Sequence, residues 1–354
     1  MEGLRGFAVT LVFLVHFASQ VAPWSAPGAL FSDLLETLHT VGNAGVDLFF
    51  VLSGYLIYGS LIARPQPFLA FMRRRVVRIY PAFLVVFVLK VVYSILRPDD
   101  GRIPDGFLAA SAYLLKNLLL LPGLLPIEPL ITVAWSLSYE MFYYLIMPAL
   151  MLAFALRSRS SAWRVGFFLV LGALILLVCA EVGGPVRLIM FISGILLYEA
   201  LRAPSLAAPG GAVTAAALAA TLVSTTMPFF GGAALSIKML ILFAGFFVLC
   251  LHCFSQPHGW LARCFSWTPM RWLGNMSYSF YLLHGLTLKI GFLLLAALWP
   301  AAPNSVLVAL SLPLMFALAL LSSTALFVLF ERPLSLAPAN PQSLTLQAKG
   351  KISA

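Results

Sequence analysis

The sequence predicts an all-α fold, a polytopic bundle of transmembrane helices. Three observations support this prediction: 62% of the 354 residues are hydrophobic, only 10% are charged, and the mean hydropathy is +0.99. A soluble domain carries about 25% charged residues and cannot hide this much apolar surface from water. The apolar residues form long runs, whereas an outer-membrane β-barrel alternates apolar and polar residues. The composition therefore excludes a soluble enzyme, a disordered protein and a disulfide scaffold.

Crossing a bilayer takes about 20 mostly apolar residues. The apolar segment 107–125 is interrupted by Lys116, Asn117 and Pro122, so we expect an interfacial or re-entrant helix there. We predict one membrane domain at 1–332, followed by a short cytoplasmic tail at 333–354 that is disordered. Ten spans are predicted near 5–24, 42–62, 79–97, 132–155, 164–181, 187–201, 211–229, 235–254, 273–298 and 305–330.

The distribution of basic residues predicts that both termini are cytoplasmic. Lys and Arg collect in cytoplasmic loops, and most of the 22 basic residues fall on that side when both termini are placed there. An even number of spans agrees with this placement. The net charge of +10 is spread between hydrophobic runs and not over a soluble basic domain. We therefore expect membrane lipids, and not nucleic acid, as partners.

The four cysteines lie in or beside apolar segments. Cys250-x-x-Cys253, with His252 and His258 nearby, can be interpreted as a zinc ligand set. Cysteine also packs readily as a small apolar residue, and we favour that interpretation. No metal is expected.

Polar residues inside the predicted spans are informative, because a charge at mid-bilayer costs roughly 2.5–3.5 kcal/mol on insertion scales. Arg5 and His16 are 11 residues apart, close to three helical turns, so both side chains share one face. The rise between them is about 16 Å, which puts His16 near the midplane if Arg5 marks the cytoplasmic edge. A histidine there can accept a proton near neutral pH. The alternative is a histidine that hydrogen-bonds a neighbouring helix.

Arginines at 73–75 and 78 open the third span. Arg75 and Arg78 are i,i+3 neighbours and Arg74 and Arg78 are i,i+4 neighbours, so several guanidinium groups converge on one face. Guanidinium forks suit phosphates in bidentate geometry. The alternative is a role in topology, in which these residues contact anionic lipid headgroups.

The second and fourth spans carry further polar residues. Asp47 lies in the outer part of the second span, and Ser53 lies deeper. Ser53 is a candidate nucleophile, but no G-x-S-x-G elbow surrounds it, and serine in membrane helices often allows close packing. Tyr139 and Glu140 open the fourth span. Glu140 can orient a sugar hydroxyl or pair with a basic group, and the tyrosines there can form an aromatic belt.

In the ninth span, polar residues recur every three positions: Asn275, Tyr278, Tyr281 and His284. They form a broad polar stripe on an otherwise apolar helix. Because such a stripe is costly against lipid, we expect it to face the interior of the bundle.

Together these segments resemble the acyltransferase-3 family of integral-membrane acyltransferases over nearly the whole chain. Each motif alone is weak, but the ordered set is specific. Glu2 stands where the family often has Asp. The sequence shows no hydrolase-like domain of the kind that some relatives append, so we expect the membrane portion alone to meet the acceptor. The matching pieces are Glu2-Gly3-Leu4-Arg5-Gly6 followed by His16, the segment 45–56, Arg75-x-x-Arg78, Trp135-Ser136-Leu137 with Tyr139-Glu140, and Asn275-x-Ser277-Tyr278 with Tyr281 and His284.

The resemblance implies about ten helices, an acyl-CoA donor used from the cytosol, and an acceptor hydroxyl on a cell-surface carbohydrate or glycolipid. It also implies that His16 is the catalytic residue and that Arg5, Arg75 and Arg78 hold the CoA or the reaction centre. We therefore expect a membrane O-acyltransferase of the bacterial inner membrane that transfers acetyl groups. Acyl-CoA, and specifically acetyl-CoA, is then a co-substrate, and no bound cofactor is expected.

In the predicted reaction, His16 deprotonates the acceptor hydroxyl as a general base or briefly carries the acyl group itself. Asp47 and Glu140 complete the catalytic group by positioning the sugar or stabilising a protonated His16. The alternative function is a transporter or flippase for a lipid-linked sugar or anion, with these three residues as a proton path. The predicted substrate-binding residues are Arg5, Arg74, Arg75, Arg78, Ser53, Tyr139, Asn275, Tyr278 and His284.

Overall fold

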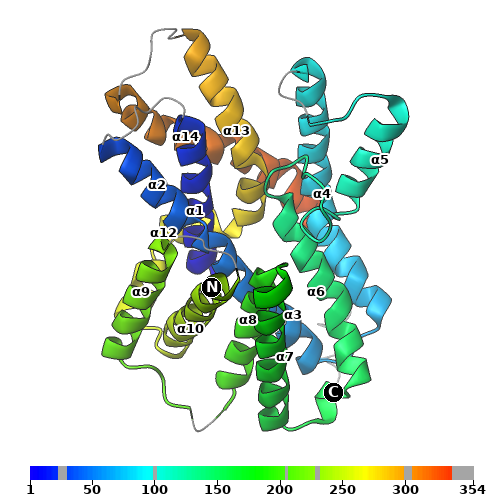
Figure 1. Cartoon of the computed structure of the whole chain (residues 1–354), viewed down its shortest axis with the longest axis vertical. Helices are drawn as coiled ribbons and strands as arrows, with labels where there is room; N and C mark the ends of the chain where they lie inside the picture. The colour runs from blue at the N-terminus through cyan, green and yellow to red at the C-terminus, as the bar shows by residue number, and fades with distance from the viewer. Residues whose placement is uncertain (23–29, 99–101, 204–205, 228–231, 299–304, 337–354) are drawn as a thin grey trace, which may run out of the picture.

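The computed structural model describes residues 1–22, 30–98, 102–203, 206–227, 232–298 and 305–336. Most of these residues are helical and no strand occurs among them, so the all-α prediction is confirmed for this part of the chain (Figure 1). The predicted tail lies outside the described residues from 337 onward. The helices are α1 (Glu2–Val21), α2 (Leu30–Gly42), α3 (Ala44–Ala63), α4 (Phe68–Leu96), α5 (Phe107–Leu118), α6 (Ala134–Ala153), α7 (Ser161–Val182), α8 (Ile189–Ala200), α9 (Gly211–Thr226), α10 (Ala233–Ser255), α11 (Trp260–Phe265), α12 (Thr268–Asn275), α13 (Ser277–Leu298), α14 (Ser305–Leu326) and α15 (Arg332–Ser335), with short turns η3 (Leu156–Ser158), η4 (Val186–Leu188) and the π-helical η5 (Phe327–Glu331).

Among the described residues, seven helical segments are long and apolar enough to cross a bilayer. Helices α8 and α9, with 12 and 16 residues, are shorter than the ~20 residues of a full crossing. Helix α6 is long enough, but Glu140 and its neighbouring tyrosines reduce its apolarity. Ten spans and cytoplasmic termini therefore stay predictions. The seven segments are Glu2–Val21, Ser32–Ala63, Phe68–Leu96, Ser161–Val182, Ala233–Ser255, Ser277–Leu298 and Leu310–Ser335.

Helix α2 was not expected from the sequence. Its residues include Asp33, Glu36 and His39, so the segment lacks the long apolar run that marks a span. In the structure α2 leads almost directly into α3, with Asn43 between them. Helix α2 packs against α1, and this contact brings His39 into the same cavity as His16.

Helix α1 packs against α2, α3, α12 and α13 (Figure 1). Its first turn lies backbone to backbone with α12, since a Cβ atom at Gly274 would stand 1.8 Å from the carbonyl oxygen of Glu2. Helices α3 and α8 cross as closely, since a Cβ atom at Gly194 would stand 1.9 Å from the carbonyl oxygen of Val51. Small residues at such crossings let membrane helices approach each other. These contacts fix α1 and α3, which carry several of the predicted site residues.

A buried ion pair joins α7 and α8. Arg164 Nε lies 2.7 Å from Glu199 Oε1, and Arg164 Nη2 lies 2.8 Å from Glu199 Oε2. The same carboxylate accepts hydrogen bonds from Ser161 Oγ at 2.6 Å and from the hydroxyl of Tyr58 on α3. A buried charge is tolerated when it is paired and hydrogen-bonded in this way. The cluster therefore fixes α3, α7 and α8 relative to one another.

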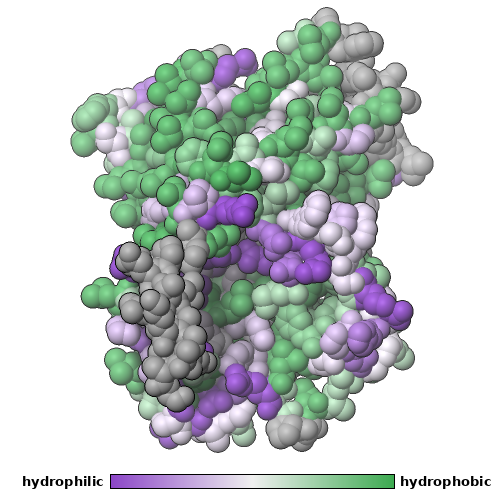
Figure 2. Space-filling model, turned by 180° about the vertical axis from the view of Figure 1, so that it is seen from behind, coloured by the Kyte–Doolittle hydropathy of each residue, from purple (hydrophilic) through white to green (hydrophobic). Residues whose placement is uncertain are grey.

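The outer surface is strongly apolar. Figure 2 shows that hydrophobic side chains cover most of the upper part of one face, while hydrophilic side chains gather in a band across its middle and along its lower edge. Leu152, Val182 and Leu298 are 85%, 78% and 81% exposed. Apolar exposure on this scale is typical of a surface that contacts lipid and not water. The protein is an integral membrane protein.

Candidate active site

Two cavities lie at opposite ends of α1 and meet inside the bundle. The arginine cavity, of about 380 Å³, is lined by Arg5, Arg75 and Arg78. The histidine cavity, of about 390 Å³, is lined by His16. Val46 and Tyr281 line both cavities. The face that Arg5 and His16 share on α1 is therefore occupied by two adjoining spaces.

The arginine cavity brings guanidinium groups from two helices together. Arg5 of α1 donates from Nε to Ser277 Oγ at 3.1 Å. Arg75 of α4 donates to Ser60 Oγ at 3.1 Å, and its guanidinium lies 5.1 Å from the ring centre of Tyr144. Its Nε atom is buried and has no hydrogen-bond partner among the described residues. Together with Arg78, these groups form a site suited to an anion.

Glu140 of α6 lines the same cavity. It accepts a hydrogen bond from the hydroxyl of Tyr144 and a longer one, 3.4 Å, from Ser53 Oγ. Arg5 lies within the electrostatic reach of Glu140 and of Arg78. The Ser53 hydroxyl is thus directed at a carboxylate, and no histidine lines this cavity among the described residues. This arrangement favours a binding role for Ser53 over a nucleophilic one.

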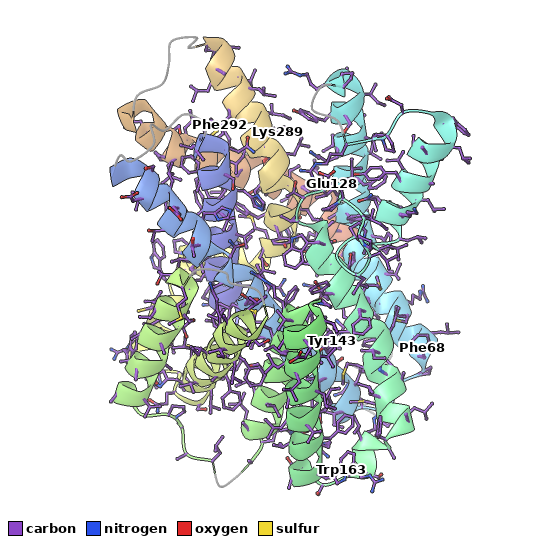
Figure 3. All side chains as sticks on the ribbon, in the orientation of Figure 1. Phe68, Glu128, Tyr143, Trp163, Lys289 and Phe292 are labelled. Atoms are coloured by element: carbon purple, nitrogen blue, oxygen red, sulfur yellow. The ribbon has the colours of Figure 1, made fainter. Side chains whose placement is uncertain are left out.

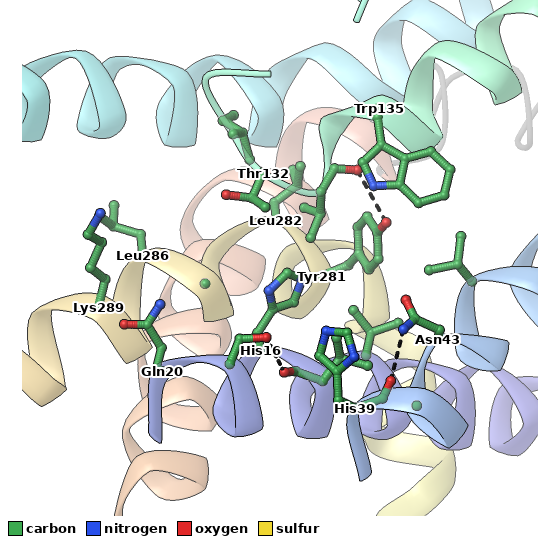
Figure 4. Close-up of a pocket in the computed structure, with 18 of the residues that line it drawn as sticks. His16, Gln20, His39, Asn43, Thr132, Trp135, Tyr281, Leu282, Leu286 and Lys289 are labelled. Carbon is green, nitrogen blue, oxygen red and sulfur yellow. Dashed lines mark hydrogen bonds between the residues drawn. The ribbon is translucent and has the colours of Figure 1, made fainter. Parts of the chain in front are cut away.

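The histidine cavity is lined by polar and basic side chains as well as apolar ones. Figure 4 shows the His16 imidazole pointing from α1 into the cavity, toward the side where Tyr281 lies. Lys289 of α13 and Arg102 line the cavity, and Arg102 forms an ion pair with Glu128 (Nε–Oε1 3.0 Å). Figure 3 shows where the two residues lie, Glu128 on the loop before α6 and Lys289 on α13. Gln20, His39, Asn43 and Thr132 also line the cavity.

Tyr281 of α13 forms the partition between the cavities. Its hydroxyl lies 2.7 Å from Ser136 Oγ and donates to the carbonyl oxygen of Val133 at 3.2 Å. Ser136 lines the arginine cavity, whereas Val133 lines the histidine cavity. A molecule that extends from one cavity into the other must therefore pass this side chain.

His284 lies behind His16 and is fully buried. The two imidazole rings are 5.1 Å apart between their centres. The Nδ1 atom of His284 lies 2.9 Å from the carbonyl oxygen of Phe280. His284 lines neither cavity, so the structure places it in contact with His16 and not with a bound substrate.

Four other predicted site residues differ in where they lie relative to the two cavities. Tyr278 lines the arginine cavity, and its hydroxyl donates to the carbonyl oxygen of Ile79 at 2.8 Å. Asp47 is 1% exposed, lines neither cavity and pairs with Arg187 (3.4 Å). Arg74 is exposed, outside the arginine cavity, and donates to Gln66. Tyr139 is buried against Phe50, with ring centres 5.7 Å apart.

Asn275 does not join the predicted stripe. Helix α12 ends at Asn275 and α13 begins at Ser277, so the residues before and after Met276 belong to different helices. Asn275 is exposed and lines a separate apolar groove between α12 and α14. The three-residue repeat is preserved only for Tyr278, Tyr281 and His284, which lie on α13.

The structure adds a buried carboxylate near the arginines that was not predicted. Glu331 is 1% exposed, and its Oε2 atom accepts hydrogen bonds from the backbone N–H (3.1 Å) and the hydroxyl (2.5 Å) of Ser279. Arg5 and Arg78 both lie within its electrostatic reach. The sequence offered one signal for this residue, because Glu331 is an acidic residue directly after the last apolar run, 305–330.

The zinc interpretation gains no support from the geometry. All four cysteines are free thiols, and His252 Nδ1 lies 3.0 Å from the carbonyl oxygen of Pro209. In the part of the chain that the structure describes, no three His, Cys, Asp or Glu side chains are grouped to hold a metal.

Comparisons with known proteins agree with one another. A family model described as an acyltransferase domain (Acyl_transf_3) matches residues 1–332. The chain is 30% identical to Acyltransferase MdmB of Streptomyces mycarofaciens, covering 82% of this chain and 79% of that protein. It is 28% identical to Peptidoglycan O-acetyltransferase OatA of Listeria monocytogenes, over 80% of this chain but 48% of that protein. O-acetyltransferase OatA of Staphylococcus aureus is 30% identical over 42% of this chain and 24% of its own length. No solved structure matches the chain.

Proposed function

The chain belongs to the acyltransferase-3 family and is an integral-membrane acyltransferase, and we propose that it transfers an acetyl group from cytosolic acetyl-CoA to a carbohydrate hydroxyl. The observation that carries this proposal is the pair of cavities that meet at Tyr281, with three arginines in one and His16 in the other. The arginines offer guanidinium groups to an anionic donor, and the histidine cavity offers a base to an acceptor hydroxyl.

The arginine cavity is the proposed donor site. CoA carries phosphates that guanidinium forks bind in bidentate geometry. A space of about 380 Å³ suits the narrow pantetheine arm, which would extend between Arg5 and Arg75 with its thioester toward Tyr281. Arg73 and Arg74 are exposed beside the entrance to α4 and would contact the nucleotide portion from the cytosol.

The histidine cavity is the proposed acceptor site. Gln20, Asn43 and Thr132 offer hydrogen bonds to sugar hydroxyls, and Trp135 offers an aromatic surface. The names of two relatives, a peptidoglycan O-acetyltransferase and an O-acetyltransferase, support a carbohydrate hydroxyl as the acceptor. The chain spans only about half of the first of these relatives. The acceptor class is therefore part of the proposal.

His16 is the proposed general base. A neutral His16 nitrogen takes the proton of the acceptor hydroxyl while the oxygen attacks the thioester carbonyl carbon. The C–S bond then breaks, and the thiolate of CoA receives the proton from His16. In the covalent variant, His16 attacks the thioester first and passes the acetyl group to the hydroxyl in a second step. Both routes return His16 to its starting state.

A transporter with a proton path through His16, Asp47 and Glu140 has less support. Glu140 lines the arginine cavity, His16 lines the histidine cavity, and Asp47 lines neither and is paired with Arg187. The three groups therefore do not share one space, as a proton path would require.

The test uses membranes that contain the full chain, radiolabelled acetyl-CoA and crude envelope carbohydrate. We expect free CoA and labelled carbohydrate to appear together with the native protein, and both to be lost with His16→Ala. The matched control is His258→Ala, which removes an exposed histidine that lines neither cavity and should leave both products unchanged. If His16→Ala still formed both products, the proposed role of His16 would be refuted. Solute movement without any release of CoA would favour the transporter.

A further inference from the structure

The hydrogen bond of His284 to its own helix determines which nitrogen carries its proton. The carbonyl oxygen of Phe280 can only accept, and it lies 2.9 Å from Nδ1. Nδ1 is therefore the protonated nitrogen of the neutral ring, and Nε2 presents a lone pair. His284 is 0% exposed, so water does not reach this lone pair from the surface.

The Nε2 atom of His284 is buried and has no hydrogen-bond partner among the described residues. Such an atom is costly unless a donor reaches it in some state of the molecule. Four other rings lie around His284, those of Phe13, His16, Phe280 and Tyr281. The ring of His16 is the nearest, and it is the only one of the four with ring nitrogens.

The separation of the two rings suits a hydrogen bond. Ring bonds of about 1.3 Å place each imidazole nitrogen about 1.1 Å from its ring centre. A distance of 5.1 Å between ring centres therefore leaves about 3 Å between two nitrogens that face each other, which is hydrogen-bond length. His284 is held by its hydrogen bond to Phe280, whereas His16 is half-exposed. The contact would therefore form by a rotation of the His16 ring.

We propose that His284 is a positioning residue, whose Nε2 lone pair accepts a hydrogen bond from His16 and thereby fixes the tautomer and orientation of the catalytic ring. This inference rests on the proposed function. With its proton held toward His284, His16 presents its other nitrogen, unprotonated, to the histidine cavity. When that nitrogen takes the hydroxyl proton, the imidazolium keeps its hydrogen bond to His284. The proton leaves again to the CoA thiolate, and His284 gains and loses none.

The surroundings of His16 explain why a neutral partner is used. In serine hydrolases a carboxylate orients the catalytic histidine. Here the titratable and charged groups that line the cavity are His39 from α2, Tyr281 and Lys289 from α13, Lys90 from α4, and Arg102. Helices α3, α12 and α14 add none, and no carboxylate lines the cavity among the described residues. In place of a carboxylate, the unpartnered Nε2 atom of His284 supplies an acceptor on a ring whose centre is 5.1 Å from that of His16.

The test compares His284→Phe, which keeps a flat ring and removes the acceptor, with His284→Gln, which restores an acceptor oxygen. CoA release from acetyl-CoA is measured against pH with the full chain in lipid nanodiscs. We expect His284→Phe to lower kcat about 100-fold, which is within the range for general-base catalysis. The KM for acetyl-CoA should stay within about twofold of the native value. Activity requires neutral His16, and removing the acceptor destabilises the imidazolium, so the acidic limb of the profile should move to lower pH. His284→Gln should have a kcat at least tenfold higher than that of His284→Phe.

His252 supplies the matched control. It is also buried, with Nδ1 bonded to a backbone carbonyl and Nε2 without a partner, but it lies beside Trp260 and away from His16. His252→Phe should therefore leave the pH profile unchanged even if it lowers the yield of folded protein. An identical profile for His284→Phe and His252→Phe, or no recovery with His284→Gln, would overturn the proposal.

A second measurement does not depend on catalysis. The chain has five histidines, so ¹⁵N NMR of histidine-labelled protein can be assigned with single variants. We expect His16 to show one tautomer in the native chain and a mixture in His284→Phe. An unchanged His16 spectrum would refute the positioning role. If His16→Ala keeps full activity while His284→Phe alters the His16 spectrum, the proposed function fails and the contact between the two rings stands.

Discussion

The hydroxyl of Tyr281 lies 2.7 Å from Ser136 Oγ, at the place where the arginine cavity and the histidine cavity meet. Helices α6 and α13 are joined by this contact, and the Tyr281 ring separates the two spaces. Under the proposed function, this separation would keep water in the histidine cavity away from the thioester of a donor in the arginine cavity. The Tyr281 ring would then have to rotate for an acyl group to pass between the two cavities.

Tyr281→Ala removes this partition. We expect acetyl-CoA hydrolysis to rise relative to transfer onto carbohydrate by about tenfold, because water then reaches the thioester. The measurement is the ratio of free CoA to labelled carbohydrate. Tyr139→Ala is the control, since it removes a buried tyrosine that lines neither cavity and should leave the ratio unchanged. Equal ratios in both variants would count against a partition.

Arg75→Ala tests the donor site. A hydrogen bond to a charged group contributes about 1.5–3 kcal/mol, so we expect the Kd for acetyl-CoA to rise about 10- to 100-fold. Arg97→Ala, at the other end of α4 and outside both cavities, should change the Kd less than about twofold. Calorimetry on the purified full chain measures both. Equal increases in Kd in the two variants would indicate a general electrostatic effect and not a specific binding site.

Asp47→Ala separates a structural role from a catalytic one. Asp47 is buried and paired with the half-buried Arg187 at 3.4 Å, and removing one partner of such an interaction costs about 1–3 kcal/mol. We expect a clearly lower Tm, with the activity of the folded fraction reduced less than about tenfold. Glu2→Ala breaks an exposed pair with Arg271 and should cost about 0–1 kcal/mol. A normal Tm with activity lost would restore the predicted catalytic role of Asp47.

Gly194→Ala tests the crossing of α3 and α8. The added methyl would stand 1.9 Å from the carbonyl oxygen of Val51, and overpacking of this kind costs about 1–3 kcal/mol or more. Gly166→Ala on α7 meets nothing within 4 Å and should be neutral or stabilise by about 0.5–1 kcal/mol. Thermal unfolding of the two variants in the same detergent measures the difference. Similar Tm values would show that the helices can separate without cost.

Much of the candidate site was predictable because it depends on the spacing of residues within one helix. The interval from Arg5 to His16 puts both on one face of α1, and the i,i+3 spacing of Arg75 and Arg78 puts both in one cavity. The same logic failed for Asn275, since the chain breaks at Met276 and changes helix. Helix periodicity applies only as far as the helix continues.

The sequence by itself determined that this protein is an all-α membrane protein, and it identified several polar side chains that turn inward, Arg5, His16 and Tyr281 among them. Apolar runs and the cost of burying charge are local properties, and they are readable in chain order. Only the tertiary structure decided what those side chains meet: Asp47 meets Arg187, His16 meets His284, and Glu331 approaches the arginines. These partners lie on helices far apart in the sequence. Their pairing depends on how close the helices can pack, which glycines such as Gly194 set through backbone contact.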